Sequence, residues 1–173
     1  DYICFDFCNM IQIKFPDASV RSFEVGTTVL DVARNISEGL ARNVLSAKFN
    51  DKVVEASTQL NEDGQIELFT WNNKEGKTAF WHSSAHVLAQ AILALYPESK
   101  LTIGPAIENG FYYDIDFGDH SITEKELRDI EKKFLEFARK KFEFKMRSAS
   151  KNEALDFYQK EGNSYKIELI ENL

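Results

Sequence analysis

The spacing of apolar residues changes between two periods within the first seventy positions, and this change constrains the fold more than any other feature. Apolar and polar residues alternate over residues 11–15, the period-two pattern of a strand with one buried face. A turn follows at residues 16–19, and Phe23 and Val25 lie two apart on a predicted return strand. The chain is therefore expected to begin with a β-hairpin.

A helical period replaces the alternation after this hairpin. Thr28 is a predicted N-cap, with Asp31 three residues later as its capping-box partner, and Gly39 is the predicted end of the helix. One apolar stripe runs along the helix: Val29, Val32, Ala33 and Ile36.

Short strands are expected after this helix. They are predicted near residues 46–50 and 53–56, followed by a turn at 61–64 and a last strand carrying Ile66 and Leu68. One helix among short strands in about 60 residues predicts an α+β fold of the β-grasp type, with the helix packed across a mixed sheet.

A second unit is expected after the polar residues 72–76, which predict a linker. A long helical pattern runs from Thr78 to Tyr96 and ends before Pro97. A hairpin over residues 104–117 follows, with apolar side chains on alternate positions.

Two further capping boxes predict the remaining helices. Thr123 and Glu126 open one, and Ser150 and Glu153 open another that ends at Gly162. Four residues form the expected buried stripe of the first: Leu127, Ile130, Phe134 and Phe137. Between the two helices, alternation of Phe142, Phe144 and Met146 predicts a strand.

Composition places broad limits on the class of protein. The net charge of −7 argues against a wholly electrostatic nucleic-acid binder, although a local basic patch remains compatible with it. No apolar run approaches a membrane span, no signal-peptide pattern is present, and Cys4 and Cys8 are too few for a disulfide framework. We therefore expect a cytoplasmic protein without membrane association. Residues 1–9 are interpreted as a cloning remnant or the product of a misplaced start codon, because the periodic pattern begins at Met10.

The sequence HSSAH at residues 82–86 is the one compact chemical signal. Residues four apart share a helix face, so the imidazoles of His82 and His86 can share a water, a ligand or a metal ion. At about 100° per residue they lie with Ala89 on a second face, opposite a main apolar stripe that includes Phe80 and Leu95.

Spacing alone leaves a structural or incidental histidine pair as the commoner alternative. A zinc site needs three or four ligands, and His120 is the one remaining histidine. Ser83 stands where a metalloprotease helix carries its general-base glutamate, so no metal site is predicted. The basic residues between 132 and 147 are interpreted as partners of a helix dipole rather than as a phosphate site.

Three segments carry a resemblance to a known family. WHSSAHVLAQAI, KLTIGPAIENGFYYDIDF and GNSYKIE resemble the proofreading domain of bacterial-type threonyl-tRNA synthetases. The unit before them resembles the ubiquitin-like TGS module that precedes this domain in those enzymes. The resemblance implies a TGS β-grasp domain at 10–71, a linker at 72–76, and at 77–173 an α+β editing domain of the threonyl/alanyl-tRNA synthetase type.

The resemblance also implies an activity and a site. The family joins threonine to its tRNA with ATP and hydrolyses mischarged Ser-tRNA(Thr), because serine lacks only one methyl of threonine. His82, His86 and Lys166 match its catalytic HxxxH and GxSYK residues, and Tyr113 and Asp114 of NGFYYD match supporting positions. The implied partner is the acceptor end of tRNA(Thr), in a homodimeric parent whose catalytic core uses ATP, Mg²⁺ and Zn²⁺.

One family segment, Asp-x-Cys-x-Gly-Pro-His, has no match here, since no Cys or His follows His120. We therefore expect part of the editing site to be missing and this region alone to be inactive, without a cofactor of its own. The alternatives are a free-standing editing hydrolase, a non-enzymatic TGS interaction module and an unrelated metalloenzyme.

Overall fold

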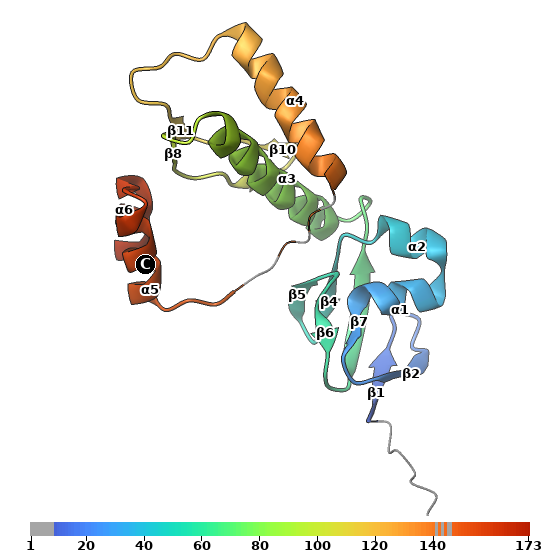
Figure 1. The fold of residues 1–173 in the computed structure, drawn as a ribbon. Helices are drawn as coiled ribbons and strands as arrows, with labels where there is room; N and C mark the ends of the chain where they lie inside the picture. Colours follow the sequence, from blue (N-terminus) through green and yellow to red (C-terminus); the bar gives the residue numbers. More distant parts are fainter. Residues whose placement is uncertain (1–8, 141, 143, 145–146) are drawn as a thin grey trace, which may run out of the picture. The chain divides into compact units, whose positions relative to one another are not determined.

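The chain folds into two compact units, residues 1–80 and 81–173. A computed structural model describes residues 9–140, 142, 144 and 147–173 (Figure 1). Cys4 and Cys8 lie outside the described residues. No helix in these ranges has the length and apolarity that crossing a bilayer requires.

A five-stranded mixed sheet forms the frame of the first unit, in the order β2-β1-β7-β4-β5. The predicted hairpin is confirmed, with β1 (Met10–Lys14) antiparallel to β2 (Val20–Glu24). The last strand, β7 (Gly64–Phe69), is parallel to β1 and antiparallel to β4 (Ser46–Phe49). At the edge, β5 (Lys52–Glu55) pairs with β4.

Local capping determines where the helix on this sheet begins. α1 (Val29–Ile36) starts at a Thr28–Asp31 capping box, as predicted. The predicted end at Gly39 is wrong, because the Ser37 side chain instead caps a second helix, α2 (Glu38–Asn43), by accepting from the Leu40 N–H. An extended backbone at Ser37 therefore separates the two helices.

The core lies between α1 and the sheet. A two-stranded pair, β3 (Thr27–Thr28) with β6 (Gln59–Leu60), closes its edge. Ile11, Ile13, Val29, Val32 and Ile66 are among its buried members. Because strand positions alternate between faces, one set of side chains meets α1, while the other face carries polar residues together with exposed Met10, Val20 and Val53. The mixed sheet with its helix confirms the β-grasp prediction.

The longest helix is α3 (Lys74–Leu95), which crosses the boundary between the two units. Its residues 74–76 were expected in a linker but form its first turn, since Lys and Glu are good helix formers even where polarity suggests a loop. Gly76 allows a close approach, because a β-carbon there would overlap the Thr70 carbonyl oxygen.

Two short strand pairs follow α3 in the second unit. β8 (Lys100–Leu101) pairs with β11 (Ile115–Asp116), and between them β9 (Ala106–Ile107) pairs with β10 (Gly110–Phe111) across a two-residue turn. The expected alternation is visible in burial, because Tyr113 is half-buried while Tyr112 is exposed.

α4 (Glu124–Lys140) begins at the predicted capping box. The Glu126 carboxylate accepts from the Thr123 N–H at 2.9 Å. Ile130 is buried as expected, but Leu127 is 57% exposed, so the predicted stripe is wrong at its N-terminal end. Of the strand predicted over Phe142, Phe144 and Met146, Met146 lies outside the described residues.

Two helices in a hairpin complete the second unit. α5 (Lys151–Lys160) has the predicted Ser150–Glu153 capping box, and Gly162 follows it with a left-handed φ of 65°. α6 (Ser164–Glu171) was not predicted. Its N-cap is Asn163, directly after that glycine.

Replacing Ile13 by alanine tests the importance of the β-grasp core. Ile13 is fully buried, so Ile13→Ala should lower the free energy of unfolding of the first unit by about 2–5 kcal/mol. Val53→Ala is the control, because Val53 is 61% exposed and should change stability by less than about 0.5 kcal/mol. Amide exchange of β1 and β4 in urea measures both, and equal effects would contradict this account.

Candidate functional site

Two imidazoles meet on α3 in the second unit. The Nε2 atoms of His82 and His86 are 3.1 Å apart, which is hydrogen-bond distance, and the ring centroids are 4.6 Å apart. The rings are nearly perpendicular, at 89°. One ring must donate and the other accept through these two nitrogens, so while this bond is formed each ring keeps its Nδ1 for a further hydrogen-bond partner.

The histidines lie on the exposed side of α3, as the predicted separation of faces requires. The composition of the faces differs from the prediction in two places. Ala89, assigned to the histidine face, is 7% exposed, whereas Phe80 of the expected apolar stripe is 41% exposed. Beyond Gly76, the buried positions are Ser84, Ala85, Ala89, Ala91 and Ile92. Small side chains therefore form much of the contact surface, which polarity patterns detect poorly.

His86 has an environment that favours its neutral form. Burial of part of the ring lowers its pKa below 6.5, and the neighbouring positive charges of His82 and Lys166 lower it further. Burial removes water that stabilises an imidazolium, and each nearby cation repels it. An unprotonated imidazole is the form that can accept a proton from water.

Lys166 enters the site from the first turn of α6, eighty residues after His86. It is half-buried, and this burial lowers the pKa of its amine. The structure thus places Lys166 close enough to His86 to affect its titration. The sequence motif singled out Lys166 but not the helix that carries it.

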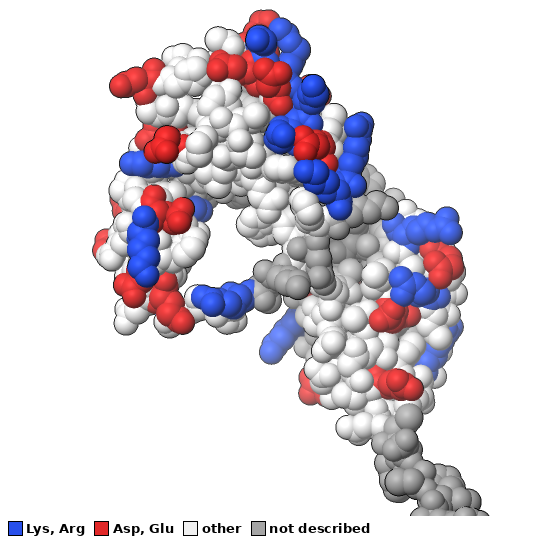
Figure 2. Space-filling model, viewed as in Figure 1, with Lys and Arg blue, Asp and Glu red and all other residues white. Residues whose placement is uncertain are grey.

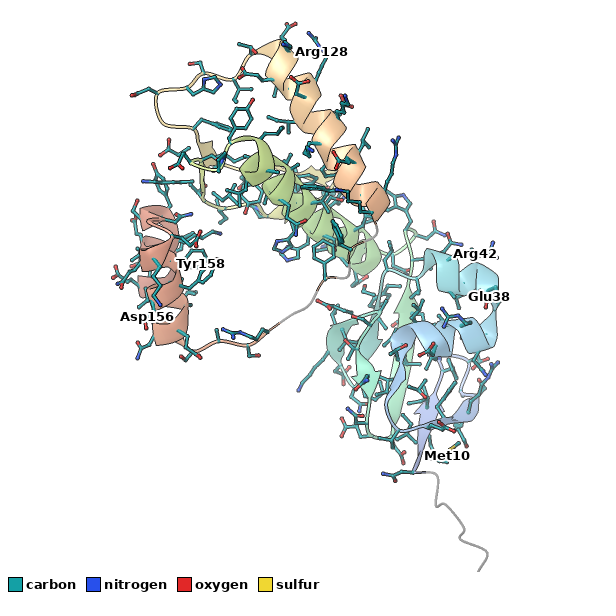
Figure 3. All side chains as sticks on the ribbon, in the orientation of Figure 1. Met10, Glu38, Arg42, Arg128, Asp156 and Tyr158 are labelled. Carbon is teal, nitrogen blue, oxygen red and sulfur yellow. The ribbon has the colours of Figure 1, made fainter. Side chains whose placement is uncertain are left out.

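Tyr113 and Asp114 lie in the segment between β10 and β11. The Tyr113 ring packs on Gly104 so closely that a β-carbon there would overlap it. Burial raises the Tyr113 pKa, as does nearby Tyr158 of α5, which Figure 3 labels. Asp114 has an exposed side chain, and its backbone pairs with Thr102 and Ile103.

His120 lies in a different environment from the histidine pair. Its Nε2 is 2.8 Å from a Glu126 oxygen, and its ring stacks on Tyr96. Within the described part of the chain, no three His, Cys, Asp or Glu side chains are grouped as a metal site would need.

A hollow of about 340 Å³ lies in the first unit. Its lining includes Lys14, Lys48 and Asn50, and none of the predicted site residues.

The basic residues of α4 are interspersed with acidic ones (Figure 2). Lys133 and Lys140 both contact Glu136, at 2.7 and 2.8 Å, and their hydrogen bonds lower its pKa to about 2. Arg139 and Lys140 occupy the last turn, where cations complement the helix dipole. This arrangement agrees with the dipole interpretation of these residues.

Comparison with known proteins gives a family model for the first unit and relatives for nearly the whole chain. Residues 11–70 match the TGS domain family. Over 164 residues, or 95% of the chain, the sequence is 56% identical to a threonine–tRNA ligase of Flavobacterium psychrophilum and 57% identical to that of Flavobacterium johnsoniae. The corresponding protein of Clostridioides difficile is 46% identical over a similar span. The chain is homologous to the N-terminal region of the threonine–tRNA ligases.

The similarity to threonine–tRNA ligases confirms the predicted family and the TGS β-grasp domain. It covers 95% of the chain, so α3 and its two histidines lie inside the matched region. The chain spans about a quarter of the length of these ligases, since it covers 25% of the first two relatives.

Lys166→Met should raise the pKa of His86 by removing one of the two cations that disfavour its imidazolium. The pKa should remain below 6.5, because burial, the larger cause, persists. Lys160→Met, on the exposed end of α5, is the matched control and should leave His86 unchanged. NMR titration of the His86 ring protons measures the change, and an unaltered value in Lys166→Met would contradict the proximity.

The lowered His86 pKa also makes folding dependent on pH. Below pH 6.5 the unfolded chain binds a proton at His86 more readily than the folded chain, so stability should fall as the pH decreases through this region. Thermal unfolding between pH 7.5 and 5.5 measures the loss. The loss should be smaller in Lys166→Met, where the shift is smaller; an identical loss in both proteins would argue against this origin.

Proposed function

We propose that this chain is the N-terminal region of a threonine–tRNA ligase and that its second unit proofreads by hydrolysing Ser-tRNA(Thr). The observation that carries the proposal is the His82–His86 pair, with its Nε2 atoms 3.1 Å apart and Lys166 close enough to lower the His86 pKa. The relatives are named threonine–tRNA ligases, which supports the family activity.

Selection between serine and threonine explains why such an enzyme needs a second site. The two amino acids differ by one methyl group, and a pocket rejects the smaller one by only about 1–3 kcal/mol. A separate hydrolytic site that accepts the seryl ester and excludes the extra methyl multiplies this discrimination.

The proposed reaction is attack of water on the ester carbonyl carbon. The bond to the ribose oxygen then breaks, and that oxygen takes up a proton as serine leaves. His82 activates or orients the water and binds the terminal ribose, while His86 shapes the same region. The lowered His86 pKa keeps that ring unprotonated at neutral pH, so an imidazole that can accept a proton lies next to His82.

Lys166 stabilises the oxyanion that develops on the carbonyl or assists the proton transfer. Its half-buried position supports this role, since a cation interacts more strongly with a developing anion where water is partly excluded. Tyr113 and Asp114 support the pocket: packing of the Tyr113 ring on Gly104 and pairing of the Asp114 backbone with Ile103 stabilise the intervening segment.

The parent enzyme is proposed to act on the acceptor end of tRNA(Thr) in the cytoplasm as a homodimer. Its aminoacylating core would use ATP, Mg²⁺ and Zn²⁺. The editing reaction is proposed to need no cofactor bound by residues 77–173. Residues 10–71 form the TGS domain in this assignment, which the family match over 11–70 supports.

Substitutions in the longer ligase test this function. His82→Ala and Lys166→Ala should each slow hydrolysis of Ser-tRNA(Thr) by about 10²-fold or more, because each removes a group that acts in the transition state. Threonine attachment should remain unchanged. Lys160→Ala is the control for loss of a lysine. Wild-type hydrolysis rates in both site variants would refute the proposed roles.

A further inference from the structure

The side-chain amide of Asn163 connects the backbone of Lys166 to a strand far away in the sequence. Its Oδ1 accepts from the Lys166 backbone N–H at 3.1 Å, and its Nδ2 donates to the Leu101 carbonyl oxygen at 2.9 Å. The first bond caps α6, and the second joins the cap to β8. One planar group therefore links the peptide that carries Lys166 to a strand 62 residues earlier.

A second bond reaches the same strand pair from Tyr165, the residue next to Lys166. The Tyr165 hydroxyl donates to an Asp116 carboxylate oxygen at 2.9 Å. Asp116 lies on β11, directly opposite Lys100 of β8. The Asp116 carboxylate is itself oriented by the Gly118 N–H, at 2.7 Å. The α6 turn is thus joined to β8 by Asn163 and to β11 by Tyr165.

We propose that Asn163 and Tyr165 are positioning residues that fix the turn of α6 carrying Lys166 on the β8–β11 pair, and so localise the Lys166 amine in the editing site. This inference rests on the proposed editing function, in which Lys166 acts on the reacting ester. A lysine side chain has four rotatable carbon–carbon bonds, so its amine is localised only if its backbone is fixed and part of the side chain is packed. Lys166 meets both conditions. The Lys166 backbone N–H donates to the Asn163 side chain, and the Lys166 side chain is half-buried.

The hydrogen bonds of Asn163 and Tyr165 act against an electrostatic repulsion between Lys166 and His86. The positive charge of Lys166 lowers the pKa of His86, which means that the two groups repel each other when both are protonated. The bonds from Asn163 and Tyr165 act against this repulsion by fixing the turn of α6 that carries Lys166. A misplacement of about 1 Å reduces catalysis by up to about 10²-fold, so loss of the ties should affect rate more than binding.

Asn163→Ser separates the two functions of the amide. Serine is a good N-cap and is too short to reach Leu101 while capping, so α6 keeps its first turn and loses the tie to β8. Tyr165→Phe removes the hydroxyl alone. Two matched controls carry the same substitutions at exposed positions, Asn152→Ser on α5 and Tyr112→Phe between β10 and β11.

The first measurement is NMR titration of His86 in the 173-residue chain. Asn163→Ser and Tyr165→Phe should each raise the His86 pKa, since the Lys166 charge moves away. In a Lys166→Met background the same substitutions should have no further effect. A general structural disturbance would instead shift the His86 pKa equally in both backgrounds, and that result would overturn the inference. An unchanged His86 pKa in the double variant Asn163→Ser/Tyr165→Phe would overturn it as well.

The second measurement is Ser-tRNA(Thr) hydrolysis by the longer ligase. Asn163→Ser and Tyr165→Phe should each lower kcat about 10-fold or more, with little change in KM and none in threonine attachment, whereas a change confined to KM would overturn the inference. If the His86 titration responds as expected but Lys166→Ala hydrolyses Ser-tRNA(Thr) normally, the positioning is correct and the proposed function is wrong. The two failures are thereby distinguished.

Discussion

One helical turn between His82 and His86 is the constraint on which the candidate site depends. Residues four apart on a helix share a face, and here the two Nε2 atoms approach to 3.1 Å. Rings this close disfavour simultaneous protonation, and burial of His86 acts in the same direction. The geometry of α3 thus yields both a donor–acceptor pair and an unprotonated nitrogen at neutral pH.

Lys166 turns this local pair into a site with three basic groups, at an electrostatic cost. Its charge disfavours protonated His86, and contacts that fix α6 act against this repulsion. Asn163 and Tyr165 supply them through bonds to β8 and β11. Like charges that lie near one another lower the stability of the folded chain. Functional sites often combine such a loss of stability with higher reactivity.

Sequence patterns predicted the features that depend on neighbouring residues. The three capping boxes, beginning at Thr28, Thr123 and Ser150, all formed because each involves residues three apart. The predictions of helix ends were wrong where a residue type, such as glycine or asparagine, can take more than one structural role. Gly39 lies within α2 because Ser37 ended α1, and α6 was missed because its cap is an asparagine after Gly162 rather than a capping box. Leu127 was expected in a buried stripe, but burial depends on which element lies opposite.

The sequence by itself determined the β-grasp order of elements, the family and the shared face of the two histidines. These follow from periodicity and motif, which act over a few residues. Only the tertiary structure decided that the charge of Lys166 lowers the pKa of His86, that Ala89 is buried rather than beside the histidines, and that Asn163 joins α6 to β8. Such relations connect residues tens of positions apart, and they depend on how elements pack. No local spacing specifies that packing.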